Sequence, residues 1–133
     1  MIFVDSSFLF AGFDRRDSFH ETARRLGDLV EDRQFVTTSH VRGELWTLVR
    51  RRLGHHAAVV VLDSFVSGWI QVAAVDAGLE EEALAWLRHR DEREYSFVDA
   101  TSFAFMRANG IREALAFDGD FAAAGFTELR PDG

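Results

Sequence analysis

The sequence predicts an α/β protein in which helices cover both faces of a central, mainly parallel sheet of four to five strands. Short apolar segments alternate with longer segments of helical periodicity along the chain. Such alternation of strands and helices is typical of parallel sheets. The 133 residues contain no repeat or low-complexity tract, and the single Pro lies at position 131. We therefore expect a single domain spanning residues 1–133.

The first strand is expected at residues 2–4, where an apolar run stops at a carboxylate and two hydroxyls. A short helix should follow over residues 6–13, with Ser6 or Ser7 as its cap. Ligands of parallel sheets bind beyond the carboxyl ends of the strands, so Asp5 lies where chemistry is usually done. Asp5 could also serve only as a helix cap, and alone it does not decide the function.

The middle of the chain predicts two further strands and four helices. Ser18 and Glu21 form a capping-box pattern, Ser39 is a suitable N-cap, and Gly54 is a helix stop. The segment before Val66 is apolar almost all round, which indicates a central helix or one covered by a partner. The expected helices are 19–31, 39–53, 55–66 and 76–87, and the expected strands are 35–38 and 69–75.

The last third of the chain predicts two helices and two strands. The pattern from Ser96 to Asp99 is a capping box that opens a helix ending at Asn109 and Gly110. Asp118 and Gly119 form a turn before a short helix. The expected ranges are helices at 96–108 and 121–124 and strands at 114–117 and 127–130.

Composition limits the classes of function. The absence of Cys excludes disulfides, a thiolate nucleophile and zinc–thiolate sites. The net charge of -7 argues against a broad basic surface that holds nucleic acid. With no signal-peptide pattern and no apolar run approaching the roughly 20 residues of a membrane span, we expect a soluble, cytoplasmic protein without a membrane partner.

Four acids occupy comparable places in the predicted topology. Asp5 and Asp118 each follow an apolar strand, and Glu44 and Asp99 each lie about one turn into a helix. All four can converge at one edge of a parallel sheet, where crowded carboxylates resist ionisation unless cations neutralise them. Hard oxygen ligands suit Mg²⁺ or Mn²⁺, which can activate water and stabilise a phosphodiester transition state. Each acid alone has a simpler interpretation as a cap, a turn or a solvated side chain.

Four segments together resemble the motifs of PIN-domain ribonucleases, and in particular the VapC toxins of bacterial toxin–antitoxin pairs. The resemblance covers essentially the whole chain. As a set the motifs are specific, whereas any one of them would be weak. The segments are residues 2–9 (IFVDSSFL), 37–45 (TTSHVRGEL), 96–103 (SFVDATSF) and 116–121 (AFDGDF).

The resemblance implies a three-layer α/β/α PIN fold and cleavage of RNA dependent on Mg²⁺, with Mn²⁺ as a substitute. It implies a metal site of Asp5, Glu44, Asp99 and Asp118. Ser6 would be a polar neighbour of that site, and Asp120 a carboxylate behind the metal ligands. It further implies a cognate antitoxin as partner and a homodimer.

Every basic residue is Arg, and the clusters include Arg50, Arg51 and Arg52, which would position an RNA strand. Genome composition would equally produce an all-Arg usage. The five His residues show no diagnostic ligand spacing. The Phe and Trp residues are expected in the core rather than as platforms for bases.

Three alternatives differ in class from a ribonuclease. A signalling receiver domain also gathers aspartates at a sheet edge, but it requires a lysine and this chain has none. A catalytically silent PIN scaffold would act through partner binding alone. A metal phosphatase would hydrolyse small phosphate esters and not RNA.

Overall fold

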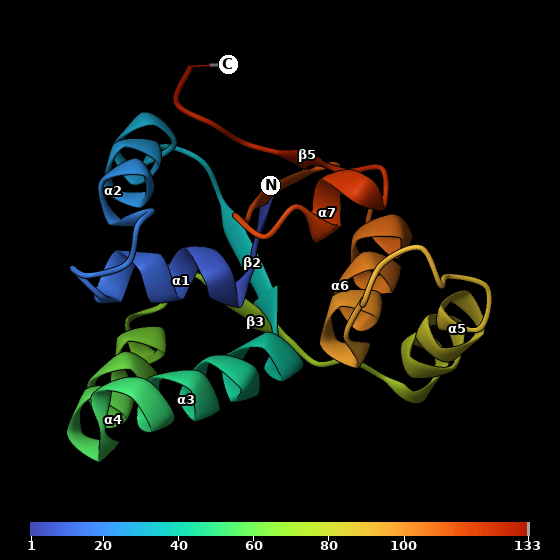
Figure 1. Cartoon of the computed structure of the whole chain (residues 1–133), viewed down its shortest axis with the longest axis horizontal. Helices are drawn as coiled ribbons and strands as arrows, with labels where there is room; N and C mark the ends of the chain where they lie inside the picture. Colours follow the sequence, from blue (N-terminus) through green and yellow to red (C-terminus); the bar gives the residue numbers. More distant parts are fainter. Residues whose placement is uncertain (133) are drawn as a thin grey trace.

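The central sheet is entirely parallel in the computed structural model, which describes residues 1–132 (Figure 1). Within those residues five strands lie in the order β3-β2-β1-β4-β5, and each neighbouring pair is parallel. This confirms the expected mainly parallel sheet of four to five strands. The strands are β1 (Ile2–Val4), β2 (Phe35–Thr38), β3 (Gln71–Ala73), β4 (Glu113–Leu115) and β5 (Thr127–Glu128).

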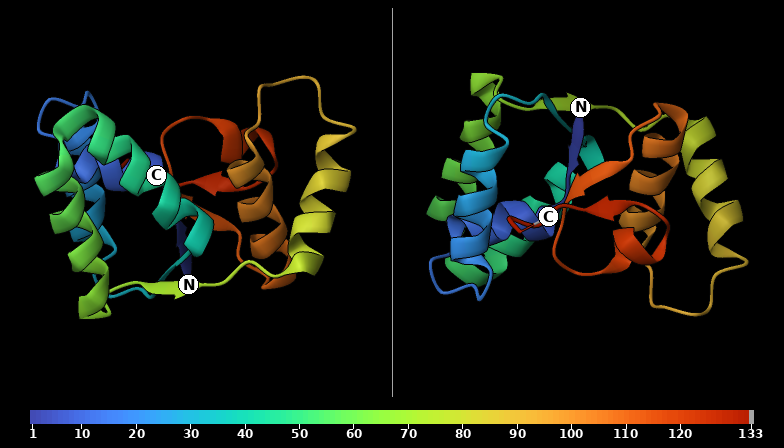
Figure 2. Two further views of the ribbon diagram at one scale, coloured as in Figure 1. Left: turned by 90° about the horizontal axis from the view of Figure 1, so that it is seen from below. Right: turned by 90° about the horizontal axis from the view of Figure 1, so that it is seen from above.

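Helices cover both faces of this sheet and form the outer layers of a three-layer arrangement (Figure 2). In Figure 1, α1 to α4 lie on one side of the sheet, and α5, α6 and α7 lie on the other. The helices are α1 (Ser6–Phe13), α2 (His20–Leu29), α3 (Ser39–Leu53), α4 (His55–Ser64), α5 (Ala77–Leu87), α6 (Phe97–Ala108) and α7 (Asp120–Ala123), with a 3-10 turn η1 (Phe65–Ser67).

The core is continuous through the central strand. Ile2, Phe3 and Val4 are completely buried, as expected for a strand covered on both faces. Phe3 contacts Phe105 and Phe121, with ring centroids 6.1 and 5.8 Å apart. Because successive side chains of a strand alternate, Ile2 and Val4 point to the opposite face. The strand that ends at Asp5 is therefore anchored from both layers.

The carboxyl ends of β1 and β4 are joined at one edge of the sheet. The Asp5 N–H donates to the Leu115 carbonyl at 3.0 Å, extending the ladder by one residue. Beyond the ladder, the Ser7 hydroxyl donates to Asp5 Oδ2 at 2.7 Å and accepts from the Phe117 N–H at 3.0 Å. This hydroxyl connects two segments 110 residues apart and fixes the spacing of the two strand ends.

The caps expected for α2 and α3 are wrong. Ser18 does not cap α2; Phe19 is its N-cap and makes no side-chain cap bond. Asp17 instead accepts the Phe19 N–H at 2.8 Å and completes a turn there. The N-cap of α3 is Thr38, whose hydroxyl accepts from the Val41 N–H at 3.2 Å, so Ser39 is already helical.

Several element ends also differ from expectation. The expected helix over 55–66 divides into α4 and η1, and α2 stops at Leu29, before Glu31. The strands expected at 69–75, 114–117 and 127–130 are each shorter, because pairing extends only over the residues that meet a neighbour in register. No helix in the described part of the chain combines the length and apolarity needed to cross a bilayer.

Removing the Ser7 hydroxyl tests the connection between β1 and β4. We expect Ser7→Ala to lower the free energy of unfolding by about 1–3 kcal/mol, because a half-buried N–H loses its acceptor and a buried carboxyl loses a donor. Urea unfolding followed by circular dichroism measures the change. Ser67→Ala, the same substitution at an exposed site, should change it by less than about 0.5 kcal/mol. Equal effects of the two substitutions would refute this account.

Candidate active site

Asp5 is a buried carboxyl at the end of the central strand. It is only 2% exposed and is the N-cap of α1. The expectation that Ser6 or Ser7 caps this helix is therefore wrong, and the cap role considered for Asp5 is confirmed. Its Oδ2 accepts from the Ser7 N–H at 3.2 Å and from the Ser7 hydroxyl. Burial, and then the charge of Asp118, raises the pKa of Asp5 to about 8.

Asp99 enters the same edge from the first turn of α6. Its Oδ2 accepts the Ser96 N–H at 3.0 Å, and its own N–H donates to the Ser96 hydroxyl at 2.9 Å. The expected capping box is confirmed. Burial raises the pKa of Asp99 to about 7 despite these bonds, with Asp118 and Asp120 contributing in the same direction. Asp99 is thus part of the capping box of α6, and its charged form is disfavoured by burial.

Asp118 and Asp120 lie on a tight turn between β4 and α7. Gly119 between them has φ +82, a left-handed conformation that favours glycine. Asp118 Oδ1 accepts the Asp120 N–H at 3.1 Å. Asp118 is exposed as a residue, yet partial desolvation of its carboxyl raises its pKa, and Asp120 adds to the effect.

Glu128 of β5 holds this turn from behind. Its side chain is 5% exposed, and its two carboxylate oxygens accept the Gly119 N–H at 3.3 Å and the Ala122 N–H at 3.0 Å. Arg130 donates to the same carboxylate at 3.2 Å. The turn that presents Asp118 is therefore fixed by a charged side chain of the edge strand.

Carboxylate oxygens of Asp99, Asp118 and Asp120 lie within 4.8 Å of one another. Asp5 adjoins this group closely enough for Asp118 and Asp99 to raise its pKa. The structure therefore brings together three of the four predicted metal ligands. It also places Asp120 directly in the tight group, nearer than the position behind the ligands that the resemblance implied.

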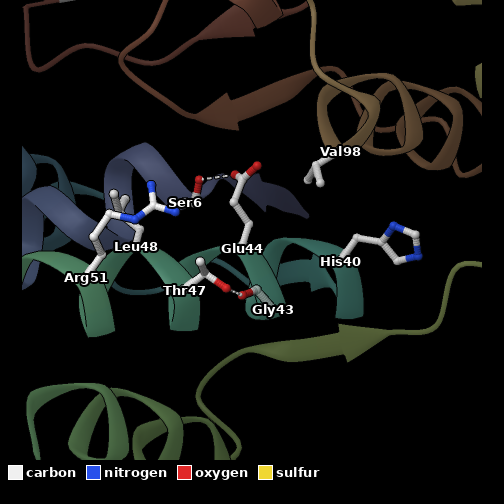
Figure 3. Close-up of a pocket in the computed structure, with 8 residues that line it drawn as sticks. All are labelled: Ser6, His40, Gly43, Glu44, Thr47, Leu48, Arg51 and Val98. Atoms are coloured by element: carbon white, nitrogen blue, oxygen red, sulfur yellow. Dashed lines mark hydrogen bonds between the residues drawn. The ribbon is translucent and has the colours of Figure 1, made fainter. Parts of the chain in front are cut away.

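Glu44 reaches the site from α3 through Ser6. The Ser6 hydroxyl donates to Glu44 Oε1 at 2.6 Å, as Figure 3 shows. Glu44 lies outside the tight group of oxygens in the described residues and lines an adjoining cleft of about 490 Å³. In Figure 3, Arg51 and Ser6 lie on one side of Glu44, and His40 and Val98 lie on the other.

The three consecutive arginines at the end of α3 have different surroundings. Arg51 lines the cleft that contains Glu44. Arg52 lies over the Phe10 ring at 5.3 Å and lines a second hollow beside Asp118. Arg50 is exposed and lines neither of these two hollows. Two of the three arginines are thus beside the acids.

Arg93 contacts the acid site from the loop between α5 and α6. Its Nε and Nη2 both approach Asp120 Oδ1 at 2.9 Å, and Nη2 donates to the Asp118 carbonyl at 3.3 Å. Tyr95 in the same loop packs edge-on against Trp86 and Phe103. The sequence did not identify Arg93, Ser7 or Glu128 as residues of the site. Only Ser7 had a signal, because it lies within the motif around Asp5.

The donor set fits a hard divalent cation. All the candidate ligands are carboxylates, the oxygen donors that Mg²⁺ and Mn²⁺ prefer. Burial, together with neighbouring acids, raises the pKa values of Asp5 and Asp99, so the charged forms of both carboxyls are disfavoured without a bound cation. Asp5, Asp99, Asp118 and Asp120 could hold such a cation, with Glu44 and Ser6 at its edge.

Comparison with known proteins gives one consistent answer. The chain matches the PIN domain over residues 2–127. It is 54% identical over 132 residues to the 23S rRNA-specific endonuclease VapC20 of Mycobacterium tuberculosis strains CDC 1551 and H37Rv, covering 99% of this chain and 100% of the relative.

Solved structures agree with this match. The crystal structure of Mycobacterium tuberculosis VapC20, described as a sarcin–ricin loop cleaving toxin, superposes with a TM-score of 0.93 at 53% identity, covering 98% of this chain and 100% of that one. A toxin–antitoxin complex from Klebsiella pneumoniae shares the fold, with a TM-score of 0.57 at 14% identity over 86% of this chain and 83% of that one. The chain therefore belongs to the PIN-domain family and, within it, to the VapC proteins.

Proposed function

We propose that this protein is a divalent-metal-dependent endoribonuclease and the toxin of a type II toxin–antitoxin pair. The proposal rests on the gathering of Asp5, Asp99 and Asp118 at the carboxyl edge of a parallel sheet, with their pKa values raised. A relative that is 54% identical over its whole length is named as an endonuclease specific for 23S rRNA. We propose the same class of substrate here, with the sarcin–ricin loop as the first RNA to test.

Asp5, Glu44, Asp99 and Asp118 would hold the metal, and Asp120 lies close enough to join them. Mg²⁺ or Mn²⁺ bound there would lower the pKa of a coordinated water and neutralise charge on the phosphodiester. The chain supplies the positioning: Ser7 orients Asp5, Ser6 orients Glu44, and the Gly119 turn presents Asp118 and Asp120.

The arginines beside the acids would position the RNA backbone. Arg51 and Arg52 line the two hollows that adjoin the acid site, so a strand crossing it would pass both guanidinium groups. Arginine forks match phosphate oxygens in pairs. Arg50, one residue earlier and exposed, would contribute through its charge. This local concentration of positive charge offsets the acidic net charge of -7 where the substrate binds.

Protein partners would cover the exposed apolar surface. Val60 and Leu62 of α4 are 49% and 41% exposed, and Val66 of η1 is 84% exposed. Exposed apolar side chains on neighbouring elements such as α4 and η1 are candidates for protein–protein contacts. We propose a homodimer and a cognate antitoxin as these partners, and the cytoplasm as the location of all three.

A catalytically silent PIN scaffold is the alternative, and metal binding distinguishes the two. We expect calorimetric titration with Mn²⁺ to show binding by the wild type and binding about ten-fold weaker or more by Glu44→Gln, which loses one anionic ligand. Glu31→Gln alters an exposed acid in the loop before β2, at the amino ends of the strands, and should bind Mn²⁺ normally. A scaffold would bind little metal, or bind it equally well in all three proteins.

Asp5→Asn tests the catalytic assignment. The amide still accepts from Ser7 and caps α1, so we expect the fold to persist. Cleavage of a sarcin–ricin loop RNA should fall by more than about 100-fold, because loss of even an outer partner of a metal ligand costs 10–100-fold. Asp63→Asn, an exposed acid on α4, should cleave like the wild type. Undiminished cleavage by purified Asp5→Asn would rule out the assignment.

The raised pKa values predict that stability without metal falls as pH rises. The folded protein keeps protons on Asp5 and Asp99 up to about pH 8 and 7, whereas the unfolded carboxyls release them near 3.8. Stability is therefore lost between about pH 4 and 8. In EDTA at pH 8, Asp5→Asn should be more stable than the wild type by an amount on the order of a few kcal/mol.

Thermal unfolding at pH 5 and pH 8, with EDTA or with Mn²⁺, measures this effect. Mn²⁺ should stabilise the wild type at pH 8 much more than at pH 5, because protons compete with the metal for the same carboxyls. It should stabilise Asp5→Asn only weakly. A wild type whose unfolding temperature rises from pH 5 to pH 8 in EDTA would contradict the assigned pKa shifts.

A further inference from the structure

A second hollow opens directly beside the acid site, on the side of α1 and the turn before α2. It has a volume of about 250 Å³, and its lining includes Ser7 and Asp118 of the acid site itself. This volume is slightly below the roughly 300 Å³ at which sites for drug-sized ligands begin. The hollow therefore suits a single planar ring system that continues from whatever is bound at Asp118.

The wall of this hollow is a pair of stacked aromatic rings. Phe19 and Phe117 are nearly parallel, with centroids 4.6 Å apart and an angle of 6° between the planes. Phe117 is 8% exposed, because Phe19 covers it and the Arg130 guanidinium lies 5.0 Å from its centroid. Phe19 is 40% exposed. The stack therefore ends in an accessible ring next to the acids.

The position of Phe19 is fixed on both sides along the chain. Asp17 accepts the Phe19 N–H at 2.8 Å, and the His20 ring lies 2.7 Å from the Ala11 carbonyl through Nδ1. An aromatic ring held in place loses little conformational freedom when a ligand stacks on it. The Phe19 ring is therefore held in place before a ligand binds.

Positive charge lies on the same hollow. Arg52 lines it together with Asp17 and Asp118, yet no carboxylate among residues 1–132 forms a salt bridge with this guanidinium. The ring of Phe10 lies beneath it at 5.3 Å. An aromatic platform beside a free guanidinium is the combination that binds single-stranded nucleic acid, because bases stack on the ring while the cation contacts the backbone.

We propose that this hollow is a subsite for one unpaired nucleobase of the RNA substrate, stacked on Phe19, with Arg52 at the neighbouring phosphate. The inference rests on the proposed ribonuclease function and adds to it a means of selecting flipped-out or single-stranded nucleotides next to the cleaved bond. The Phe and Trp residues are expected in the core rather than as platforms for bases, but Phe19 is 40% exposed and is not a core residue.

Binding measured without cleavage tests this subsite. The probe is a fluorescein-labelled sarcin–ricin loop RNA, titrated in EDTA and followed by fluorescence anisotropy. Phe19→Leu, which keeps apolar bulk but removes the ring, should weaken binding by roughly 5- to 150-fold. Phe19→Trp should bind within about three-fold of the wild type, since it keeps a stacking face. Phe13→Leu is the matched control, because Phe13 is 39% exposed but does not line this hollow, and its binding should not change.

A scan with abasic RNAs tests the same subsite in the unmodified protein. One abasic position should weaken binding by the wild type about as much as Phe19→Leu weakens binding of intact RNA. Phe19→Leu should bind this abasic RNA no more weakly than it binds intact RNA, because the variant lacks the ring on which the missing base would stack. Agreement of the two experiments identifies the nucleotide that occupies the hollow.

Two results would overturn the subsite: no measurable RNA binding by the wild type, or equal binding by wild type and Phe19→Leu. The second result would indicate that the exposed Phe19 ring contacts a protein and not a base. Cleavage is measured separately by adding Mn²⁺ to the wild type. RNA binding that depends on Phe19, without cleavage of any RNA, would support the subsite and contradict the proposed nuclease activity. The two proposals can therefore fail independently.

Discussion

The Ser7 hydroxyl is the contact on which the site most depends. It donates to Asp5 and accepts from the Phe117 N–H, so it joins the ends of the central strand and its neighbour beyond the last ladder bond. Without it the carboxyl of Asp5 would be buried with little to stabilise its charge. Because Asp118 directly follows Phe117, the same bond limits how far Asp5 can lie from Asp118.

The clustered acids lower the stability of the fold but provide ligands for a cation. Burial and mutual repulsion raise the pKa values of Asp5 and Asp99, which means that the protein alone disfavours the charged state it has assembled. A cation would relieve that cost. Arg93 provides part of the relief through Asp120, and Glu128 and Ser96 hold the surrounding backbone. The site is thus preorganised by structural bonds and left short of positive charge.

Charge and aromatic surface are distributed locally in a way that the totals conceal. The chain carries a net charge of -7, yet Arg51 and Arg52 line two hollows beside the acids. Phe19 adds an exposed ring to the same neighbourhood. Together these features describe a surface suited to a polyanion that presents unpaired bases, which agrees with the RNA substrate proposed for this site.

The sequence by itself determined the parallel α/β fold, the PIN family and the strand-end positions of Asp5 and Asp118, because strand periodicity and local motifs encode them. It also predicted the Ser96–Asp99 capping box, a contact between near neighbours. Only the tertiary structure decided that Arg93 pairs with Asp120, that Glu128 holds the Gly119 turn, that Ser7 reaches Phe117, and that Ser18 is not a cap. The first three contacts join different elements, so they depend on how loops and strand ends meet in space, and no local pattern specifies that distance. At Ser18, Asp17 closes a turn by accepting the Phe19 N–H on its side chain and the His20 N–H on its carbonyl, so the helix starts only at His20 and Ser18 lies before its cap.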